Sequence, residues 1–406
     1  MPGGSAALMR SASKRQPKRD ALVARGSRDD ASRSPASRVN VIRTDLLVVG
    51  LGPAGCAAAS AALSTAPGLR VVAIDAATFP RDKLCGGAVP GGGLRELALA
   101  GLELRVPHVR ASHARLRACR NEVRVALPTP AAVVERRSFD ADLVAQVRAA
   151  GGQVIEAAPL LGIEGGVART GAGDVEFRAA IVADGASATG RRSLGLPAGH
   201  RVPLREARAP RAQEDLVFDL DAGVTGYAWR FPCPGTSSLE ENLGAYALAG
   251  GGVDAALRGW AAAEDLPAAA PEAWALRVRD RLEPTGVPGA LLAGEALGAD
   301  PLLGEGIRYA LWSGRIAGRL AARALRAGRV PSPAAYRRAL ACTRTGVVLA
   351  LFVRLAPRLY GTDLRWRGAA ADPTVAAAFA GLVSGEPVVP AGARLLARYA
   401  AGRRGP

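Results

Sequence analysis

The sequence predicts an α/β fold in which a parallel βαβ domain is interleaved with an antiparallel-sheet domain and followed by short C-terminal helices. Three observations predict it. An apolar strand at residues 45–49 runs directly into a glycine-rich turn, a helix of small residues and a second strand. Residues 110–135 alternate polar and apolar side chains, and residues 215–250 also have strand character. Beyond Pro331, proline and glycine divide the chain into short helical segments.

The glycine-rich turn is the most specific feature of the chain. It reads Gly50-Leu51-Gly52-Pro53-Ala54-Gly55, and the helix after it covers residues 56–63. The second strand, residues 70–74, ends on Asp75. This order is typical of a dinucleotide-binding, Rossmann-like unit. The alternative is a glycine-rich turn in another kind of α/β protein.

Each residue type in this turn has a physical role. Gly50 permits the tight turn, Gly52 lets the backbone approach a pyrophosphate, and Gly55 lets the helix pack closely on the strand. The helix N-terminus presents free N–H groups to phosphates. Asp75 is placed to accept hydrogen bonds from a ribose diol.

The remaining elements follow in order along the chain. We predict a helix over 136–150, strands at 153–155 and 180–183, a helical region over 253–283, a strand at 290–294, and a long helix ending near Ala327. The strand at 180–183 ends in Asp184-Gly185-Ala186-Ser187, at the sheet edge where ligands bind. A second GxGxxG fingerprint is missing, so pyridine nucleotide has no dedicated domain here.

Composition excludes several classes of function. The net charge is +17, but all the positive residues except Lys14, Lys18 and Lys83 are arginines, and aromatic residues are not interleaved with them. We therefore expect no nucleic-acid partner. Five scattered cysteines without a CxxC pair, and only three histidines, argue against a disulfide framework and against a metal site. Reduced cytoplasm is the expected location.

Two segments lie outside the predicted sheets. Residues 1–43 carry ten Lys or Arg against three Asp or Glu, with no apolar periodicity, and we expect a disordered basic tail. The most apolar stretch, residues 346–353, is shorter than the roughly 18 residues of a membrane span and ends at Arg354. It is either a core helix or a helix that faces lipid.

A set of motifs in order resembles the FAD-dependent geranylgeranyl reductase family, within the class of flavoproteins that includes the aromatic hydroxylases. The resemblance covers about residues 44–330. The motifs are Gly50 to Gly55, Pro80-Arg81-Asp82-Lys83-Leu84-Cys85-Gly86-Gly87, Arg136 to Asp140, Ala183 to Ser187, Tyr227-Ala228-Trp229-Arg230-Phe231-Pro232, and Gly294-Glu295 through Asp300 to Ile307. The Cys-Gly-Gly loop and the Tyr-x-Trp-x-Phe-Pro segment are more specific to the reductases than the others.

The resemblance implies a cofactor, FAD, and a role for each motif residue. The cofactor-binding residues it implies are Gly50, Gly52, Pro53, Ala54, Gly55, Asp75, Cys85, Gly86, Arg136, Asp184, Gly294, Glu295, Gly304, Glu305, Gly306 and Ile307. Cys85 would lie beside the isoalloxazine ring and is the candidate catalytic residue, as a proton donor or a tuner of the flavin. Tyr227, Trp229 and Phe231 would line the substrate pocket. The helix after Gly306 would direct its positive end at the flavin.

Two departures from the family pattern bear on specificity. Glu295 stands where the family has Asp, and Tyr246 follows Gly244 where a small residue is expected. Both concern the fit of the prenyl chain more than FAD binding. Lys83 is the only lysine after residue 18, and either a phosphate contact or a solvated surface position suits it.

Three functions remain open from the sequence. The first is reduction of C=C bonds in an apolar, prenyl-like substrate by hydride from reduced flavin. It implies an external electron donor, NAD(P)H or a ferredoxin-like protein, and contact with a membrane from the cytoplasmic side. The second is a flavin monooxygenase or halogenase that acts on a secondary metabolite. The third is a binding protein that holds FAD without catalysis.

The motif positions also predict domain boundaries. Residues 44–87, 136–200 and 286–330 would form the FAD-binding domain, residues 88–135 and 201–285 the substrate domain, and residues 331–406 a C-terminal helical region.

Overall fold

The computed structural model describes residues 41–210, 213–235, 239–267, 270–280, 283–360 and 372–384. Most of the predicted basic tail lies outside these residues. Its predicted boundary at residue 43 is wrong by two residues, because Ile42 and Arg43 already belong to the first strand and pair with Val175 and Glu176.

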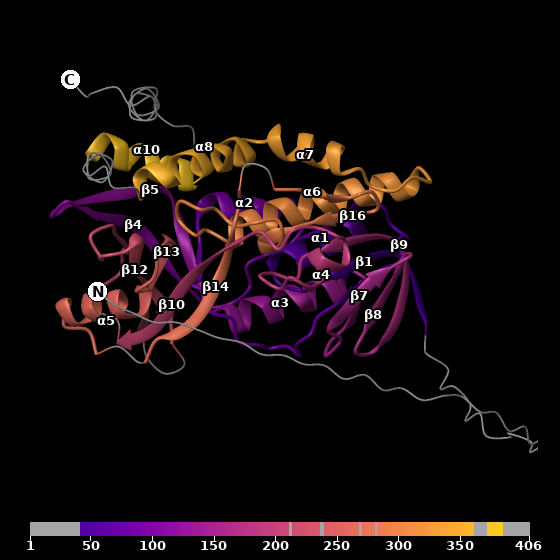
Figure 1. Ribbon diagram of the computed structural model, residues 1–406, viewed down its shortest axis with the longest axis horizontal. Helices are drawn as coiled ribbons and strands as arrows, with labels where there is room; N and C mark the ends of the chain where they lie inside the picture. Colours follow the sequence, from indigo (N-terminus) through magenta and orange to yellow (C-terminus); the bar gives the residue numbers. More distant parts are fainter. Residues whose placement is uncertain are drawn as a thin grey trace, which may run out of the picture. The chain divides into compact units, whose positions relative to one another are not determined.

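A mostly parallel sheet forms the first layer (Figure 1). Its strands are, in order across the sheet, β15 (Gly286–Val287), β16 (Ala290–Leu292), β9 (Gly173–Val182), β1 (Ile42–Val49), β2 (Val71–Ile74) and β6 (Gln153–Ile155). The strands from β16 to β6 are parallel, and β15 is antiparallel to β16. The hairpin of β7 (Leu160–Glu164) and β8 (Val167–Thr170) extends β9 at one edge. The predicted βαβ unit is therefore the centre of this sheet.

Helices cover this sheet through unusually small side chains. α1 (Pro53–Thr65) contacts α6 (Ile307–Arg326) and α3 (Arg136–Ala149), and α2 (Gly91–Leu99) also packs on α6. A Cβ atom on Gly314 would lie 2.0 Å from the carbonyl oxygen of Ala54. One on Gly318 would lie 2.1 Å from that of Ala58. The α1 and α6 backbones are thus in direct contact, which requires glycine in α6.

A second sheet forms the other layer and is antiparallel except where β11 and β4 run parallel. Its strands are, in order, β14 (Glu272–Val278), β10 (His200–Pro210), β13 (Leu239–Ala249), β12 (Thr225–Pro234), β11 (Leu216–Asp219), β4 (His108–Ala118), β5 (Asn121–Val134) and β3 (Ala88–Val89). Two short elements complete the region, α4 (Thr189–Ser193) and the 3₁₀ helix η1 (Gly294–Ala296).

The helix predicted over 253–283 is wrong in its second half. Among the described residues of this segment only α5 (Val253–Ala263) is helical, and Glu272–Val278 forms β14, which pairs with residues 200–206 of β10. The segment is rich in Ala and Leu, which favour helix locally, but pairing with the free edge of β10 satisfies its backbone groups and overrides that preference.

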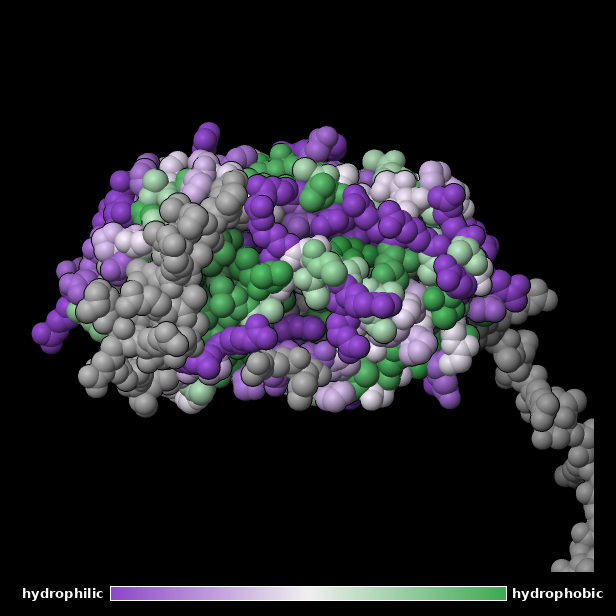
Figure 2. Space-filling view, turned by 90° about the horizontal axis from the view of Figure 1, so that it is seen from above, coloured by the Kyte–Doolittle hydropathy of each residue, from purple (hydrophilic) through white to green (hydrophobic). Residues whose placement is uncertain are grey.

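The C-terminal helices α7 (Pro333–Ala341), α8 (Arg344–Leu359) and α10 (Pro373–Ser384) lie along the upper edge of Figure 1. Figure 2 faces this side and shows apolar and hydrophilic side chains mixed on its surface. α8 and α10 pack on the antiparallel sheet, where the rings of Phe352 and Phe379 stack 5.8 Å apart. Residues 346–353 all belong to α8, and Val348, Leu349 and Phe352 bury one side of this helix in the core, whereas Val347 is exposed.

No single helix among the described residues is long and apolar enough to cross a bilayer. α7 and α8 meet that test of length and composition only as a pair, and they are bent by 88° relative to each other.

Candidate functional site

A cavity of about 740 Å³ lies between the two sheets. It brings together nearly all the residues that the sequence singles out. Its lining includes Gly50, Gly52, Pro53, Ala54, Asp75, Cys85, Gly86, Arg136, Asp184, Tyr227, Trp229, Phe231, Glu295, Gly304, Glu305, Gly306 and Ile307. The two exceptions are Gly55 and Gly294, which pack behind the lining. The cavity therefore joins the nucleotide-type turn at one end to an aromatic wall at the other.

The turn after β1 is built as the sequence predicts. Gly50 has a φ of +92°, and a Cβ there would lie 2.4 Å from the carbonyl oxygen of Ala183. A Cβ on Gly55 would lie 1.7 Å from the carbonyl oxygen of Gly50, so only glycine fits at either position. α1 begins with Pro53 and has no side-chain cap. Its first N–H groups are therefore available to an anion in the cavity.

Asp75 is held in place by the backbone of this turn. Its carboxylate accepts hydrogen bonds from the N–H of Leu51 at 2.7 Å and from the N–H of Ala77 at 2.9 Å. A carboxylate has about four acceptor positions, so a fixed Asp75 can still accept from a hydroxyl in the cavity.

Two guanidinium groups converge on the same turn. Arg136 is buried and makes two hydrogen bonds to Asp140, at 2.8 and 2.6 Å. Burial lowers the pKa of Arg136, but the Asp140 carboxylate outweighs this and raises it overall. Arg81 lies 3.2 Å from the same carboxylate. Sequence reasoning named the motif around Arg81 but gave this residue no role, and it now joins Arg136 beside Gly52.

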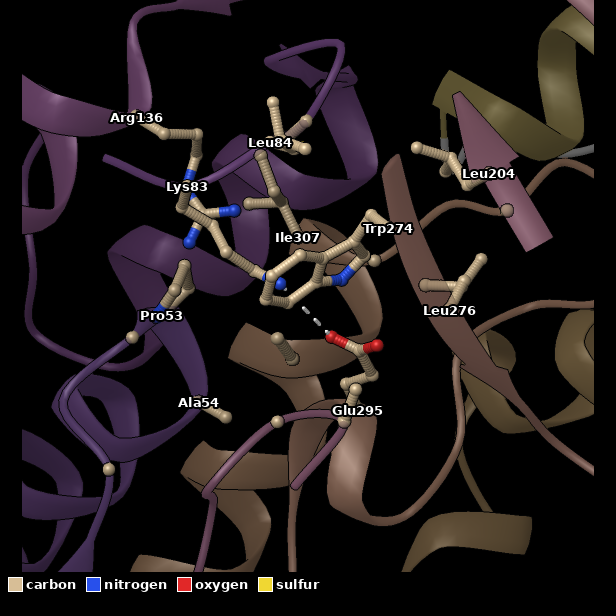
Figure 3. A pocket seen from close by; sticks show the side chains of 18 of the residues that line it. Pro53, Ala54, Lys83, Leu84, Arg136, Leu204, Trp274, Leu276, Glu295 and Ile307 are labelled. Atoms are coloured by element: carbon tan, nitrogen blue, oxygen red, sulfur yellow. Dashed lines mark ion pairs between the residues drawn. The ribbon is translucent and has the colours of Figure 1, made fainter. Parts of the chain in front are cut away.

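Lys83 crosses the cavity, as Figure 3 shows. Its Nζ lies 3.7 Å from Glu295 Oε2 and 3.6 Å from the centre of the Trp274 ring. Burial lowers the pKa of Lys83, while Glu295 acts in the opposite direction. Sequence reasoning left the role of Lys83 open and missed Trp274. The isolation of Lys83 in an arginine-rich chain was the available signal, whereas Trp274 lay in a segment predicted to be helical.

The Cys85 loop rests on the aromatic wall. Gly87 N–H contacts Cys85 Sγ at 3.5 Å, and a Cβ on Gly86 would lie 2.8 Å from the ring of Phe231. The loop therefore presents the Cys85 thiol to the cavity between the nucleotide-type turn and the wall.

The wall itself is a cluster of rings from neighbouring strands. Tyr227, Trp229 and Phe231 alternate along β12, and Tyr246 of β13 packs edge-on against Tyr227 at 5.2 Å. Tyr227 and Tyr246 donate their hydroxyls to the carbonyl oxygens of Leu303 and Pro301. Because these polar groups are satisfied within the protein, the cluster presents mainly apolar surface to the cavity.

Tyr246, which departs from the family pattern, is packed firmly into this aromatic cluster. Its ring is 1% exposed and lies against both Tyr227 and Tyr360. It narrows the apolar end of the cavity, where the family pattern has a small residue.

Two buried carboxyl groups lie where α6 begins. Asp300 accepts hydrogen bonds from the N–H groups of Leu302 and Leu303, at 2.7 and 3.1 Å. Glu305 lies 2.9 Å from Arg308, one turn into the helix. Burial raises the pKa of both carboxyls to about 7, against the opposing effect of the backbone N–H groups on Asp300 and of Arg308 on Glu305. The helix N-terminus and a carboxyl that titrates near neutrality thus face the same space.

Glu295 and Gly294 hold the strand-to-helix turn after β16. Glu295 Oε1 accepts from the N–H of Arg277 at 3.1 Å, so the longer side chain is anchored to β14. A Cβ on Gly294 would lie 2.6 Å from Ala54 Cβ, which explains glycine at that position. Within the described part of the chain, no group of three or more His, Cys, Asp or Glu side chains could hold a metal ion.

Comparison with known proteins identifies relatives along most of the chain. A menaquinone reductase of Mycolicibacterium smegmatis is 33% identical over 322 residues, which cover 68% of this chain and 76% of the relative. A menaquinone reductase of Mycobacterium tuberculosis is 31% identical over 316 residues. A digeranylgeranylglycerophospholipid reductase of Methanothermobacter thermautotrophicus is 29% identical over 218 residues, or 49% of this chain and 57% of the relative. No protein-family model matches the sequence.

Solved structures share the fold at low sequence identity. A geranylgeranyl bacteriochlorophyll reductase-like protein from Thermoplasma acidophilum superposes with a TM-score of 0.72 at 20% identity, covering 88% of this chain and 96% of that one. A flavin-dependent brominase superposes with a TM-score of 0.67 at 16% identity, covering 89% and 98%. The α/β architecture predicted from the sequence is thus confirmed as the fold of flavin-dependent enzymes.

Proposed function

The chain belongs to the FAD-dependent geranylgeranyl reductase family, and on that basis we propose that it reduces C=C bonds in the prenyl chain of an apolar substrate. The family resemblance expected from the sequence is confirmed, and the chain is a flavin-dependent oxidoreductase. The observation that carries the substrate proposal is the cavity, which joins the nucleotide-type turn to an apolar, aromatic wall.

We propose FAD as the flavin, because the residues at the polar end fit a dinucleotide. Two arginines surround the open space beside Gly52, where a phosphate could approach the backbone. A Cβ atom built on Gly52 has a nitrogen of Arg81 at 3.5 Å and one of Arg136 at 4.0 Å as its nearest neighbours. Asp184 Oδ1 is buried without a hydrogen-bond partner in the described structure, so a ligand donor can satisfy it. Gly50, Gly52, Asp75 and Arg136 would hold the ADP half. Asp184, Glu295 and Gly304 to Ile307 would hold the rest. Bound and reduced, this group supplies a hydride.

The chain's own residues would position the alkene and provide the proton. Tyr227, Trp229 and Phe231 exclude water and orient an apolar chain, since their polar atoms are occupied within the protein. Cys85 lies on the loop between this wall and the nucleotide-type turn, and we assign it as the proton donor to the second alkene carbon. Lys83 and Glu295 close the cavity beside it.

The relatives narrow the first substrate to test. Three of them are named menaquinone reductases, and a menaquinone carries a long prenyl chain with isolated double bonds. We propose that this chain acts on a quinone of that kind, with electrons from a separate donor protein or NAD(P)H. The proposed domain division follows: residues 44–87, 136–200 and 286–330 would bind the flavin, and residues 88–135 and 201–285 the substrate.

The test is a two-step assay on the full chain. Purified protein should show flavin absorbance at about 375 and 450 nm that bleaches with anaerobic dithionite. The reduced protein is then incubated with menaquinone in detergent, and mass spectrometry should show a gain of two hydrogens per reduced double bond. A flavin-loaded protein that leaves every prenyl alkene intact would overturn the proposal.

The monooxygenase and halogenase alternative rests on shared fold alone, since those neighbours are below 20% identity. Substrate-dependent oxygen consumption in the same preparation would favour it. The binding-protein alternative has no relative to support it, because the relatives are reductases.

A further inference from the structure

The chain between residues 306 and 362 contains eleven arginines and no aspartate or glutamate. The protein as a whole has 36 acidic residues in 406, so this segment departs sharply from the rest. It comprises α6, α7 and α8, of which α7 and α8 lie along the upper edge of Figure 1 and α6 lies beneath α7. The charge is therefore concentrated on one side of the fold.

Eight of these arginines are exposed, and seven of them, all except Arg344, define what we call the arginine face. They are Arg323, Arg326, Arg329, Arg337, Arg338, Arg354 and Arg358. Hydrogen bonds of this face go to backbone carbonyls, as from Arg326 to Thr65 and from Arg358 to Arg354. No carboxylate in the described part of the chain lies within ion-pair distance of any of the seven. The face thus keeps its full positive charge.

Exposed apolar side chains lie among these arginines. Val330 is 54% exposed and Val347 of α8 is 62% exposed, whereas the other large apolar residues of α8 are buried or half-buried. Figure 2 shows this mixture of hydrophilic and apolar side chains from above. Arginines beside a few exposed valines fit an anionic lipid surface, where the cations contact headgroups and the valines reach the acyl boundary.

The inner side of α8 links this face to the cavity. Tyr360, at the end of α8, donates its hydroxyl to the carbonyl oxygen of Leu302. Its ring lies 6.0 Å from that of Tyr246, which lines the apolar end of the cavity. One helix therefore separates the arginine face from the proposed substrate wall.

We propose that the arginine face docks the enzyme on an anionic phospholipid bilayer, which holds the apolar end of the cavity close to the lipid. This inference rests on the proposed function, because a prenyl-lipid substrate is dissolved in such a bilayer. Lipid is preferred over nucleic acid since no aromatic side chain is exposed among the described arginines to stack on bases.

The test is vesicle co-sedimentation of the full, flavin-loaded protein. Vesicles of phosphatidylglycerol and phosphatidylcholine should bind it at low ionic strength, and binding should weaken as salt rises. The triple variant Arg337→Gln, Arg338→Gln, Arg354→Gln should bind on the order of 100-fold more weakly, at roughly fivefold per arginine.

A matched variant controls for net charge. Arg43→Gln, Arg169→Gln, Arg258→Gln removes the same charge from exposed positions on β1, β8 and α5, and should bind like the wild type. Three results would each overturn the proposal. The two triple variants could lose vesicle affinity equally, the protein could bind pure phosphatidylcholine as tightly as anionic vesicles, or it could bind RNA more tightly than vesicles. Binding is measured without turnover. A protein that docks but leaves prenyl alkenes intact in detergent contradicts only the proposed function, and one that turns over without docking contradicts only this inference.

Discussion

Trp229 is the residue whose position depends most on its neighbours. A Cβ on Gly244 would lie 1.9 Å from the indole Cζ2, and one on Gly86 would lie 3.1 Å from Nε1. The indole N–H donates to Asn242 Oδ1 at 2.7 Å. Two glycines and one amide thus hold the ring between the Cys85 loop and the antiparallel sheet.

Gly244→Ala should displace this ring. Overpacking of this kind costs about 1–3 kcal/mol of unfolding free energy, and the reduction rate of a prenyl substrate should fall while flavin content stays constant. Urea unfolding and the 450 nm absorbance measure the two effects. Gly259→Ala in α5 is the control, because a Cβ there has no neighbour within 4 Å and should not destabilise the helix. If Gly244→Ala and Gly259→Ala had the same stability and the same reduction rate, the close packing of Trp229 against Gly244 would be contradicted.

The buried Glu206 carboxyl, which is hydrogen-bonded to Asn242, should make the stability of the protein depend on pH. Glu206 Oε1 accepts from Asn242 Nδ2, Oε2 is buried without a partner in the described structure, and burial raises the pKa of Glu206 to about 7. An unfolded glutamate has a pKa of about 4.5, so between these values the folded state binds more protons and stability falls as pH rises. The loss amounts to about 3 kcal/mol by pH 8.

Glu206→Gln removes this titration. Its unfolding free energy should therefore change less than that of the wild type between pH 4.5 and 8, as measured by urea unfolding at a series of pH values. Parallel pH profiles for the two proteins would show that Glu206 is ionised in the folded state.

Cys85 is assigned as the proton donor, and Cys85→Ala tests the assignment. The variant should keep its flavin, because the nucleotide-type turn is untouched, and lose about 100-fold in the rate of alkene reduction. Single-turnover reoxidation of the reduced protein by substrate measures this rate. An unchanged rate would mean that another group, such as an ordered water, delivers the proton.

At the scale of elements, the contact between α1 and α6 supports the cofactor end of the cavity. Gly314 of α6 faces the carbonyl oxygen of Ala54, which belongs to the glycine-rich turn. The first turn of α6 also contributes Ile307 and Ala310 to the cavity. One interface thus positions both helix N-termini that we assign to the flavin.

Gly314→Ala should therefore weaken flavin binding from behind the site. A new Cβ would lie 2.0 Å from backbone, which cannot move cheaply, so α6 must shift away from α1. We expect a loss of about 1–3 kcal/mol in stability and roughly tenfold in flavin affinity, measured by titrating apoprotein with FAD. If the variant were less stable but bound FAD as tightly as the wild type, the contact between α1 and α6 would not support flavin binding.

The elements differ in how far the sequence alone could predict them. The βαβ unit was predicted correctly because its glycines, strand and helix are contiguous, so local constraints determine the structure. β14 was missed because its conformation depends on pairing with β10, about 70 residues earlier in the chain. Residues 346–353 left two alternatives open, and only the packing of α8 on the antiparallel sheet decided for a core helix.

At the scale of the whole molecule, the cavity could not have been predicted as a shape. The motifs gave its lining residues, and nearly all of them do line it. The contact of Lys83 with Glu295 and Trp274 joins parts of the chain roughly 200 residues apart, and no local pattern specifies such a meeting. The sequence thus singled out residues that the fold gathers around one cavity, while the closure of that cavity depends on how the two sheets pack.

Because the cavity lies between the two sheets, its occupant should stabilise both. The apolar core of the parallel sheet and that of the antiparallel sheet are separate clusters, and the cavity touches residues of each. A ligand present at 100 times its Kd adds about 2.7 kcal/mol to the free energy of unfolding, which for a chain of this size raises Tm by about 3–4 °C. Removing the flavin should lower Tm by that amount for both sheets together, as followed by calorimetry of holoprotein and apoprotein.

The variant Gly55→Ala supplies the control for this measurement. A Cβ at that position would lie 1.7 Å from the carbonyl oxygen of Gly50 and would break the nucleotide-type turn, so added FAD should no longer raise Tm. A holoprotein that melts at the same temperature as the apoprotein would place the flavin outside this cavity. A flavin-dependent shift confined to one of two resolved transitions would show that the ligand contacts a single sheet.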